Sequence, residues 1–221
     1  IPFIDLGAQQ ARIRDRIDRG IATVLDHGAY IMGPEVTAIE TRLAEAAGTR
    51  HCISCSSGTD ALILALLAHG LRPGQGVIVP SFTFAASAEV MPVLGAVPVF
   101  AEVDAATFNL DPSRLDDALQ AGREADIEIV GIIGVGLFGQ PADYNAIQAF
   151  ASEHGMWVID DAAQSFGAAL NNVPVGRLAE TTCTSFFPAK PLGCYGDGGA
   201  VFTDDDEKAE IMRSCRIQGC L

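Results

Sequence analysis

Lysine is scarce in this sequence of 221 residues, because the chain contains only Lys190 and Lys208. Acidic side chains number 28 against 14 for lysine and arginine together, which gives a formal net charge of −14. No stretch concentrates positive charge, so the chain is not expected to bind a nucleic acid through its phosphate backbone. A small anionic ligand is not excluded, since backbone amides at a helix N-terminus can hold one.

Long apolar runs are missing as well, since acidic residues, glycine or proline interrupt each one. The sequence therefore predicts no membrane-spanning helix, and it shows no secretory signal. Because it starts at Ile1 rather than Met, we expect at least one residue of the natural protein to precede it. Apolar residues make up 49% of the chain, which is typical of a globular protein with a large core.

The six cysteines have no metal-like spacing. Cys52 and Cys55 form a C-x-x-C pattern, but the residues around them favour a strand, where positions i and i+3 face opposite sides. A redox pair would instead open a helix after a strand. We therefore expect reduced thiols and a cytoplasmic protein.

Apolar segments with helical and strand periodicity alternate along most of the chain. This pattern predicts an α/β fold with a mostly parallel sheet covered by helices on both faces. We expect one unit over 1–221, made of N-terminal helices (1–48) and an α/β core (49–221). The expected helices cover 6–26, 34–45, 61–70, 83–94, 111–121, 141–154 and 204–216. The expected strands cover 51–55, 77–80, 97–100, 127–135, 156–160, 182–187 and 200–203.

Ligands of such sheets bind beyond the carboxyl ends of the strands. Four loops of this chain carry polar or aromatic residues at such ends: Ser56–Asp60, Ser81–Phe84, Asp160–Gln164 and Ser185–Lys190. These loops are therefore the candidate site, and each has a functional and an ordinary structural interpretation.

Lys190 lies in a loop that is constrained by Pro188 and Pro191 and is followed by four glycines within seven residues. Such a lysine either extends its amine from a surface turn or is a desolvated amine. A desolvated amine can form a Schiff base with a carbonyl, as in enzymes that use pyridoxal phosphate. Lys208, in an acidic helical segment, is interpreted as a solvated charge.

Each of the other three loops also has two possible interpretations when it is considered alone. Ser57–Thr59 favours either a phosphate held by free helix amides or an ordinary helix N-cap. Phe82 and Phe84 either pack in the core or stack on a flat heteroaromatic ring. Asp160 and Asp161 either cap the next loop or place a carboxylate against a pyridine nitrogen, which would keep that nitrogen protonated.

A glycine pattern suggests a different ligand. Gly134, Gly136 and Gly139 match G-x-G-x-x-G after a strand, and Asp160 follows at a distance typical of a ribose-binding acid. In a dinucleotide site, however, the third glycine lies inside the start of the helix. Here we expect the helix to begin at Pro141, so the pattern does not favour a nicotinamide enzyme.

Together, five ordered blocks resemble the DegT/DnrJ/EryC1/StrS family of pyridoxal-phosphate-dependent sugar aminotransferases. The blocks are SSGTDAL (56–62), VPSFTF (79–84), GQPADY (139–144), DDAAQSFGA (160–168) and SFFPAKPLGCYGDGGA (185–200). The resemblance extends from Phe3 to about Arg216. It implies the large domain of the aspartate aminotransferase fold, known as fold type I of pyridoxal-phosphate enzymes.

The resemblance also implies roles for individual residues. Lys190 would be the Schiff-base lysine that also shuttles protons. Asp161 would be the carboxylate at the pyridine nitrogen, and Phe84 would be the ring that stacks on the cofactor. A hydrogen bond near the ring hydroxyl would come from Gln164. The phosphate would be held by Gly58, Thr59 and Ser185.

The implied reaction moves an amino group from glutamate to a keto group of a nucleotide-linked sugar in a homodimer with shared active sites. The lysine block and residues 3–18 look most like the subgroup acting on UDP-2-acetamido-2-deoxy-3-keto-glucuronic acid. That reaction would supply cell-surface polysaccharide, such as lipopolysaccharide. Alternatives are another nucleotide 3- or 4-keto-deoxysugar, a dehydratase, and a non-enzymatic regulator that binds the cofactor.

Two departures from the family stand out. Family members continue into a small C-terminal domain, so we expect part of the substrate pocket and dimer surface to lie outside this sequence. Residues 135–138 read VGLF, where the family more often has a polar residue and a tyrosine. The contact made by this segment is therefore left open.

Overall fold

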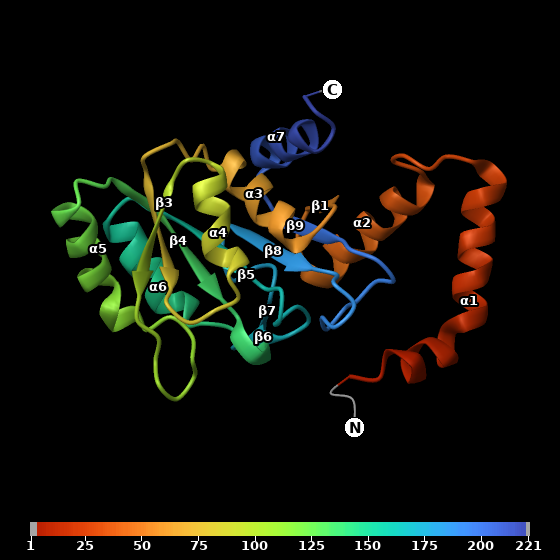
Figure 1. Ribbon diagram of the computed structural model, residues 1–221, viewed down its shortest axis with the longest axis horizontal. Coiled ribbons are helices and arrows are strands. Elements are labelled where there is room, and N and C mark those ends of the chain that lie inside the picture. The colour runs from red at the N-terminus through yellow and green to blue at the C-terminus, as the bar shows by residue number, and fades with distance from the viewer. Residues whose placement is uncertain (1–3, 220–221) are drawn as a thin grey trace.

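A seven-stranded sheet forms the centre of the computed structural model, which describes residues 4–219 (Figure 1). Its strands are β1 (His51–Cys55), β2 (Gly76–Pro80), β3 (Val97–Ala101), β4 (Ile129–Val135), β5 (Trp157–Asp161), β8 (Thr181–Ser185) and β9 (Gly199–Thr203). The helices are α1 (Leu6–His27), α2 (Pro34–Ala47), α3 (Gly58–Ala68), α4 (Ala86–Val93), α5 (Leu115–Glu124), α6 (Tyr144–Glu153) and α7 (Asp206–Arg216). Two 3₁₀ turns, η1 (Pro112–Arg114) and η2 (Leu137–Gly139), complete these elements.

The strand order is β1-β9-β8-β5-β4-β2-β3. The five strands from β8 to β3 pair in parallel, whereas β9 pairs antiparallel with both β8 and β1. Two successive antiparallel pairings restore the direction, so β1 runs the same way as β8. The carboxyl ends of β1, β2, β5 and β8 consequently lie at one edge of the sheet.

Helices cover both faces, as the apolar strands require. On one face, α3, α4 and α7 pack over strand residues such as Ile133, Ile159 and Val201. On the other face, α5 and α6 pack over Ile78, Ile132 and Val158, and α2 covers the end near β1 and β9. Among these, α3 is apolar nearly all round and is enclosed by β8, β9 and α7.

The N-terminal helices follow from local signals. Asp5 caps α1, Gly33 with the N1 proline opens α2, and Gly28 and Gly48 end the two helices in the left-handed conformation. Figure 1 shows α1 standing away from the sheet. No residue of α1 is buried, so apolar side chains such as Ile21 and Leu25 have no partner within the described chain.

Some expectations about local structure were wrong. The helix after β4 begins at Tyr144 with Asp143 as its N-cap, not at Pro141, because the Asp143 carboxylate accepts the amide of Ala146. The expected helix over 83–94 begins at Ala86. The hairpin β6 (Ala169–Leu170) and β7 (Val173–Pro174), with its Asn171–Asn172 turn at positive φ, was not predicted.

The predicted thiols are confirmed for the five cysteines within residues 4–219, which are all free, while Cys220 lies outside the described residues. Cys52 and Cys55 belong to or pack against different core clusters, as expected for opposite faces of a strand. Over the same residues, none of the helices combines the length and apolar character that crossing a bilayer requires.

Candidate active site

The candidate site lies along the edge where β1, β2, β5 and β8 end. Gly58 opens α3 directly after β1, and Ser57 caps this helix by accepting the Asp60 amide at 3.0 Å. The ordinary N-cap interpretation is therefore right for Ser57. The amides of the first turn remain pointed at the sheet edge, where the helix dipole favours an anion.

Gly58, at the start of α3, lies directly against Ser185, at the end of β8. A side chain at position 58 would place its Cβ 2.6 Å from Ser185 Cβ and 3.1 Å from Ser185 Oγ. Only glycine allows so close an approach between α3 and β8. Ser185 Oγ accepts the Phe187 amide at 3.2 Å, and Thr59 is exposed in the first turn of α3. The three predicted phosphate contacts thus lie close together where α3 begins and β8 ends.

Asp161 is the buried carboxylate of the site. It is the last residue of β5 and is 6% exposed. Its Oδ2 accepts the Ser87 hydroxyl at 2.7 Å, and its Oδ1 accepts the Ala163 amide at 3.1 Å. Burial raises the pKa of Asp161, while these two donors and the positive charge of Lys190 oppose the rise. The site therefore holds a desolvated carboxylate that a cationic N–H would stabilise.

Lys190 and Phe84 come from different loops and lie close together, and the charge of Lys190 acts on Asp161. The Lys190 Nζ atom lies 5.8 Å from the centroid of the Phe84 ring. Phe84 is 67% exposed, so one face of its ring is open for stacking rather than packed in the core. Phe82 instead contacts Phe108, at 5.7 Å between ring centroids. Lys190 is half-buried, as its loop between two prolines requires.

Gln164 has a defined partner on the neighbouring loop. Its Oε1 accepts the amide of Phe138 at 2.9 Å, and Phe138 adopts the left-handed conformation at φ 56°. The amide group of Gln164 therefore orients the loop after β4. Two glycines at this point serve packing, because Gly134 of β4 adjoins the Tyr144 ring and Gly136, which follows β4, adjoins Ser165.

Sequence reasoning missed Ser87 and Thr83. Ser87 is buried in α4 and donates to Asp161, and its Oγ lies 3.2 Å from Thr83 Oγ1. A serine on the buried face of a predicted helix was the only signal available, since such a hydroxyl needs a partner. The partner itself, 74 positions away, could be found only from the fold.

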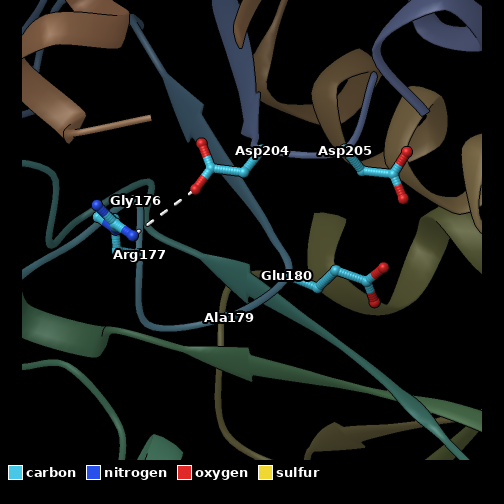
Figure 2. A pocket seen from close by; sticks show the side chains of 6 residues that line it. All are labelled: Gly176, Arg177, Ala179, Glu180, Asp204 and Asp205. Carbon is cyan, nitrogen blue, oxygen red and sulfur yellow. Dashed lines mark ion pairs between the residues drawn. The ribbon is translucent and has the colours of Figure 1, made fainter. Parts of the chain in front are cut away.

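A cavity lies elsewhere in the molecule. It measures about 400 Å³ and is lined by Gly176, Arg177, Ala179, Glu180, Asp204 and Asp205 (Figure 2). These residues precede β8 or follow the antiparallel β9, which places them at the opposite edge from Ser185. Arg177 pairs with Asp204, while Glu180 and Asp205 bind Lys208 Nζ. The cavity is therefore separate from the candidate site.

This sheet order, with a lysine loop after β8 and a carboxylate at the end of β5, defines the structural class of the protein. The chain has the fold of the large domain of aspartate-aminotransferase-like, fold type I enzymes, as predicted.

The comparisons with known proteins give the family. Residues 11–221 match the model of the DegT/DnrJ/EryC1/StrS aminotransferase family, and the chain belongs to this family. It is 53% identical over 219 residues to a UDP-2-acetamido-2-deoxy-3-oxo-D-glucuronate aminotransferase of Pseudomonas aeruginosa, covering 99% of this chain and 59% of that protein. It is 43% identical to a UDP-N-acetyl-3-dehydro-alpha-D-glucosamine 3-aminotransferase of Acidithiobacillus ferrooxidans, covering 99% of this chain and 58% of that protein.

Solved structures agree with this assignment. A family aminotransferase from Brucella abortus superposes with a TM-score of 0.93 at 50% identity, covering 97% of this chain and 58% of that one. A Bacillus subtilis protein with bound cofactor PMP superposes with a TM-score of 0.88 at 31% identity, covering 97% and 47%. The chain thus spans less than two thirds of the length of the relatives it matches.

Proposed function

We propose that this chain is the cofactor-binding part of an aminotransferase that moves an amino group from glutamate to the C3 keto group of UDP-2-acetamido-2-deoxy-3-keto-glucuronic acid. The similarity to the Pseudomonas aeruginosa relative carries this proposal, because it extends over 99% of the chain at 53% identity. The product would serve cell-surface polysaccharide synthesis, such as that of lipopolysaccharide, in the cytoplasm.

The residues of the site fit pyridoxal phosphate. The approach of Gly58 to Ser185 leaves helix amides and a hydroxyl free for a phosphate, in a space that any Cβ at position 58 would fill. Within residues 4–219, Asp161 is a buried carboxylate that forms no ion pair with an arginine or lysine, which suits a pyridinium N–H. When bound, pyridoxal phosphate supplies an aldehyde that condenses with amines and a ring that accepts electrons.

Each residue then has a physical task. Gly58, Thr59 and Ser185 hold the phosphate through amides and hydroxyls, so the negative net charge of the chain is no obstacle. Phe84 covers one face of the ring. Asp161 keeps the proton on the pyridine nitrogen, with Ser87 fixing the carboxylate.

Two further side chains complete the site. Lys190 carries the amine that binds the aldehyde, and it moves protons at Nζ. Gln164, held against the Phe138 amide, positions the loop next to the ring hydroxyl. All these contacts come from loops at strand ends, whose backbone the sheet keeps in place.

Lys190→Ala in the full-length enzyme tests the assignment. We expect loss of the visible absorbance of the bound cofactor and of amino transfer from glutamate to the UDP-keto-uronate. Lys190→Arg keeps the charge, and it should lose both as well because a guanidinium does not replace the amine. Lys208→Ala, which removes the other lysine, should keep both. Turnover retained in Lys190→Ala would contradict the proposal.

A second candidate differs only in the sugar. The similarity to the Acidithiobacillus ferrooxidans relative, at 43% identity, favours a UDP-3-keto-hexosamine that lacks the C6 carboxylate. A panel of nucleotide keto sugars with glutamate as donor separates the two candidates by kcat/KM. Cofactor binding with no turnover of any sugar would instead favour a regulator.

We also propose a homodimer with shared active sites. The exposed apolar stripe of α1, which includes Ile21 at 55% and Leu25 at 62% exposure, supports it. Sedimentation of the full-length protein should give twice the chain mass, and replacing both side chains with glutamate should shift it toward the monomer. A wild-type monomer would contradict this proposal.

A further inference from the structure

Asp160, the neighbour of Asp161, has no part in the site described above. Its side chain points to the opposite face of the sheet, into the cluster around Tyr144 and α6, and it is fully buried. Gly134 of β4 and Thr182 of β8 lie in register with Asp160, one on each side of it, so the three residues form a row across the strands. Gly134 leaves room for the Tyr144 ring, which a Cβ there would approach to 2.9 Å.

The hydrogen bonds in this row leave two buried polar atoms without a partner within residues 4–219. Tyr144 donates its hydroxyl to Asp160 Oδ1 at 2.6 Å. Asp160 Oδ2 and Thr182 Oγ1 are both buried and have no other partner. These two atoms belong to in-register neighbours on adjacent strands, so one hydrogen bond between them would satisfy both, donated either by the Thr182 hydroxyl to a carboxylate or by a proton on Oδ2 to Thr182 Oγ1. The charges around Asp160 decide between the two.

The charges around the two neighbouring carboxyl groups differ. Asp161 receives two hydrogen bonds and faces Lys190. Within residues 4–219, the titratable groups acting on Asp160 are the Tyr144 phenol, the Cys183 thiol and Asp161 itself, and none is a cation. Two buried carboxylates on consecutive residues repel each other, so one negative charge is favoured there, on Asp161.

We propose that Asp160 is a neutral carboxylic acid in the working enzyme, with its proton on Oδ2 directed at Thr182 Oγ1. It is thereby a positioning residue that leaves the single charge at the end of β5 on Asp161. Its role for Asp161 rests on the proposed function, whereas its protonation does not.

The protonation of Asp160 then depends on the pH of the solution. Burial raises the pKa of Asp160 to about 7, and the repulsion of Asp161 adds to the rise, while the hydrogen bond from Tyr144 opposes it. Ionisation of Asp160 above that pH would place a second charge beside Asp161. The cofactor site would consequently respond to alkaline pH through a residue that does not touch the cofactor.

Infrared spectroscopy of the full-length protein with ¹³C-labelled aspartate tests the protonation directly. One pH unit below the pKa of about 7, the spectrum should contain a label-shifted carbonyl band of a protonated carboxylic acid. One unit above it, the band should fall about tenfold. Asp160→Asn should remove the band, Asp161→Asn should keep it, and Thr182→Val should move it to higher wavenumber because the acid loses its acceptor.

Kinetics of Asp160→Asn test the positioning role, since asparagine resembles the neutral acid. Below the pKa, the variant should keep the visible cofactor spectrum and a kcat/KM within about threefold of wild type. Its spectrum should no longer change as pH rises through 7. Absence of the band in wild type at low pH, or its survival in Asp160→Asn, would overturn the protonation. A loss of kcat/KM beyond about tenfold in a folded variant would overturn the role.

Discussion

Gly58→Ala is the substitution whose effect can be worked out most closely from the geometry. The added Cβ would lie 2.6 Å from Ser185 Cβ and 3.2 Å from Ser185 Cα. Neither atom is the flexible end of a side chain, so α3 and β8 must move apart. Their separation is fixed on both sides, because α3 is enclosed by the sheet and α7.

Two effects set the magnitude. Overpacking of this kind costs about 1–3 kcal/mol. Alanine favours a helix over glycine by up to about 1 kcal/mol, which offsets part of the cost. We therefore expect a net loss of about 1–2 kcal/mol and a melting temperature lower by about 2–8 °C. Loss of one hydrogen bond to a charged phosphate should weaken cofactor binding about tenfold.

Urea denaturation and cofactor titration measure these two quantities. Gly20→Ala is the matched control, because nothing lies within 4 Å of the added Cβ and alanine stabilises a helix interior. Ser185→Gly removes the nearest clashing atom, so Gly58→Ala should cost less in that background. An equal cost in both backgrounds would show that the contact between α3 and β8 is not the cause.

Two further predictions concern stability. Arg216→Ala leaves the partly buried Glu40 without its ion-pair partner and should cost about 1.5–3 kcal/mol in urea denaturation, whereas Arg14→Ala, which breaks an exposed pair, should cost under about 1 kcal/mol. Equal costs would contradict the importance of burial. Asp160 keeps its proton up to a pH of about 7 in the folded protein, whereas an unfolded aspartate releases it near a pH of about 4. The contribution of this proton to the free energy of unfolding is therefore complete at low pH and is lost as pH rises through 7. Urea denaturation at a series of pH values should show that the free energy of unfolding of wild type falls relative to that of Asp160→Asn. The fall should be up to about 1.4 kcal/mol per unit of difference between the folded and unfolded pKa. If the free energies of the two proteins change in parallel with pH, the prediction is wrong.

Most of the fold could be predicted because its signals are local. Continuous apolar strands and capped helices identified the alternating core, and Gly28 and Gly48 ended their helices where expected. The antiparallel direction of β9 could not be predicted, since strand direction depends on pairing partners rather than on composition. The start of α6 was misplaced because Pro141 and Asp143 both resemble helix starts, and only Asp143 makes the capping hydrogen bond.

The sequence predicted which loops at the strand ends carry the candidate site, but it did not predict how their side chains come together. Gly58, Ser185, Phe84 and Lys190 were chosen one loop at a time, and their convergence follows from the sheet order. Asp160 shows where such reasoning stops, because two adjacent aspartates look alike in a sequence. The pleat of β5 separates them, giving one a lysine and the other a tyrosine. The roles of the site residues and the single unit over 1–221 stay predictions.

The pairing of β1 with β9 has a consequence for biosynthesis. His51 faces Thr203 across the sheet, so β1 has no strand to join until the ribosome has released almost the whole described chain. The turn at Gly58 is therefore synthesised early but cannot be placed against Ser185 until late. A nascent chain that ends after β5 would carry β1 as an unpaired edge, and chaperones would meet it in that form.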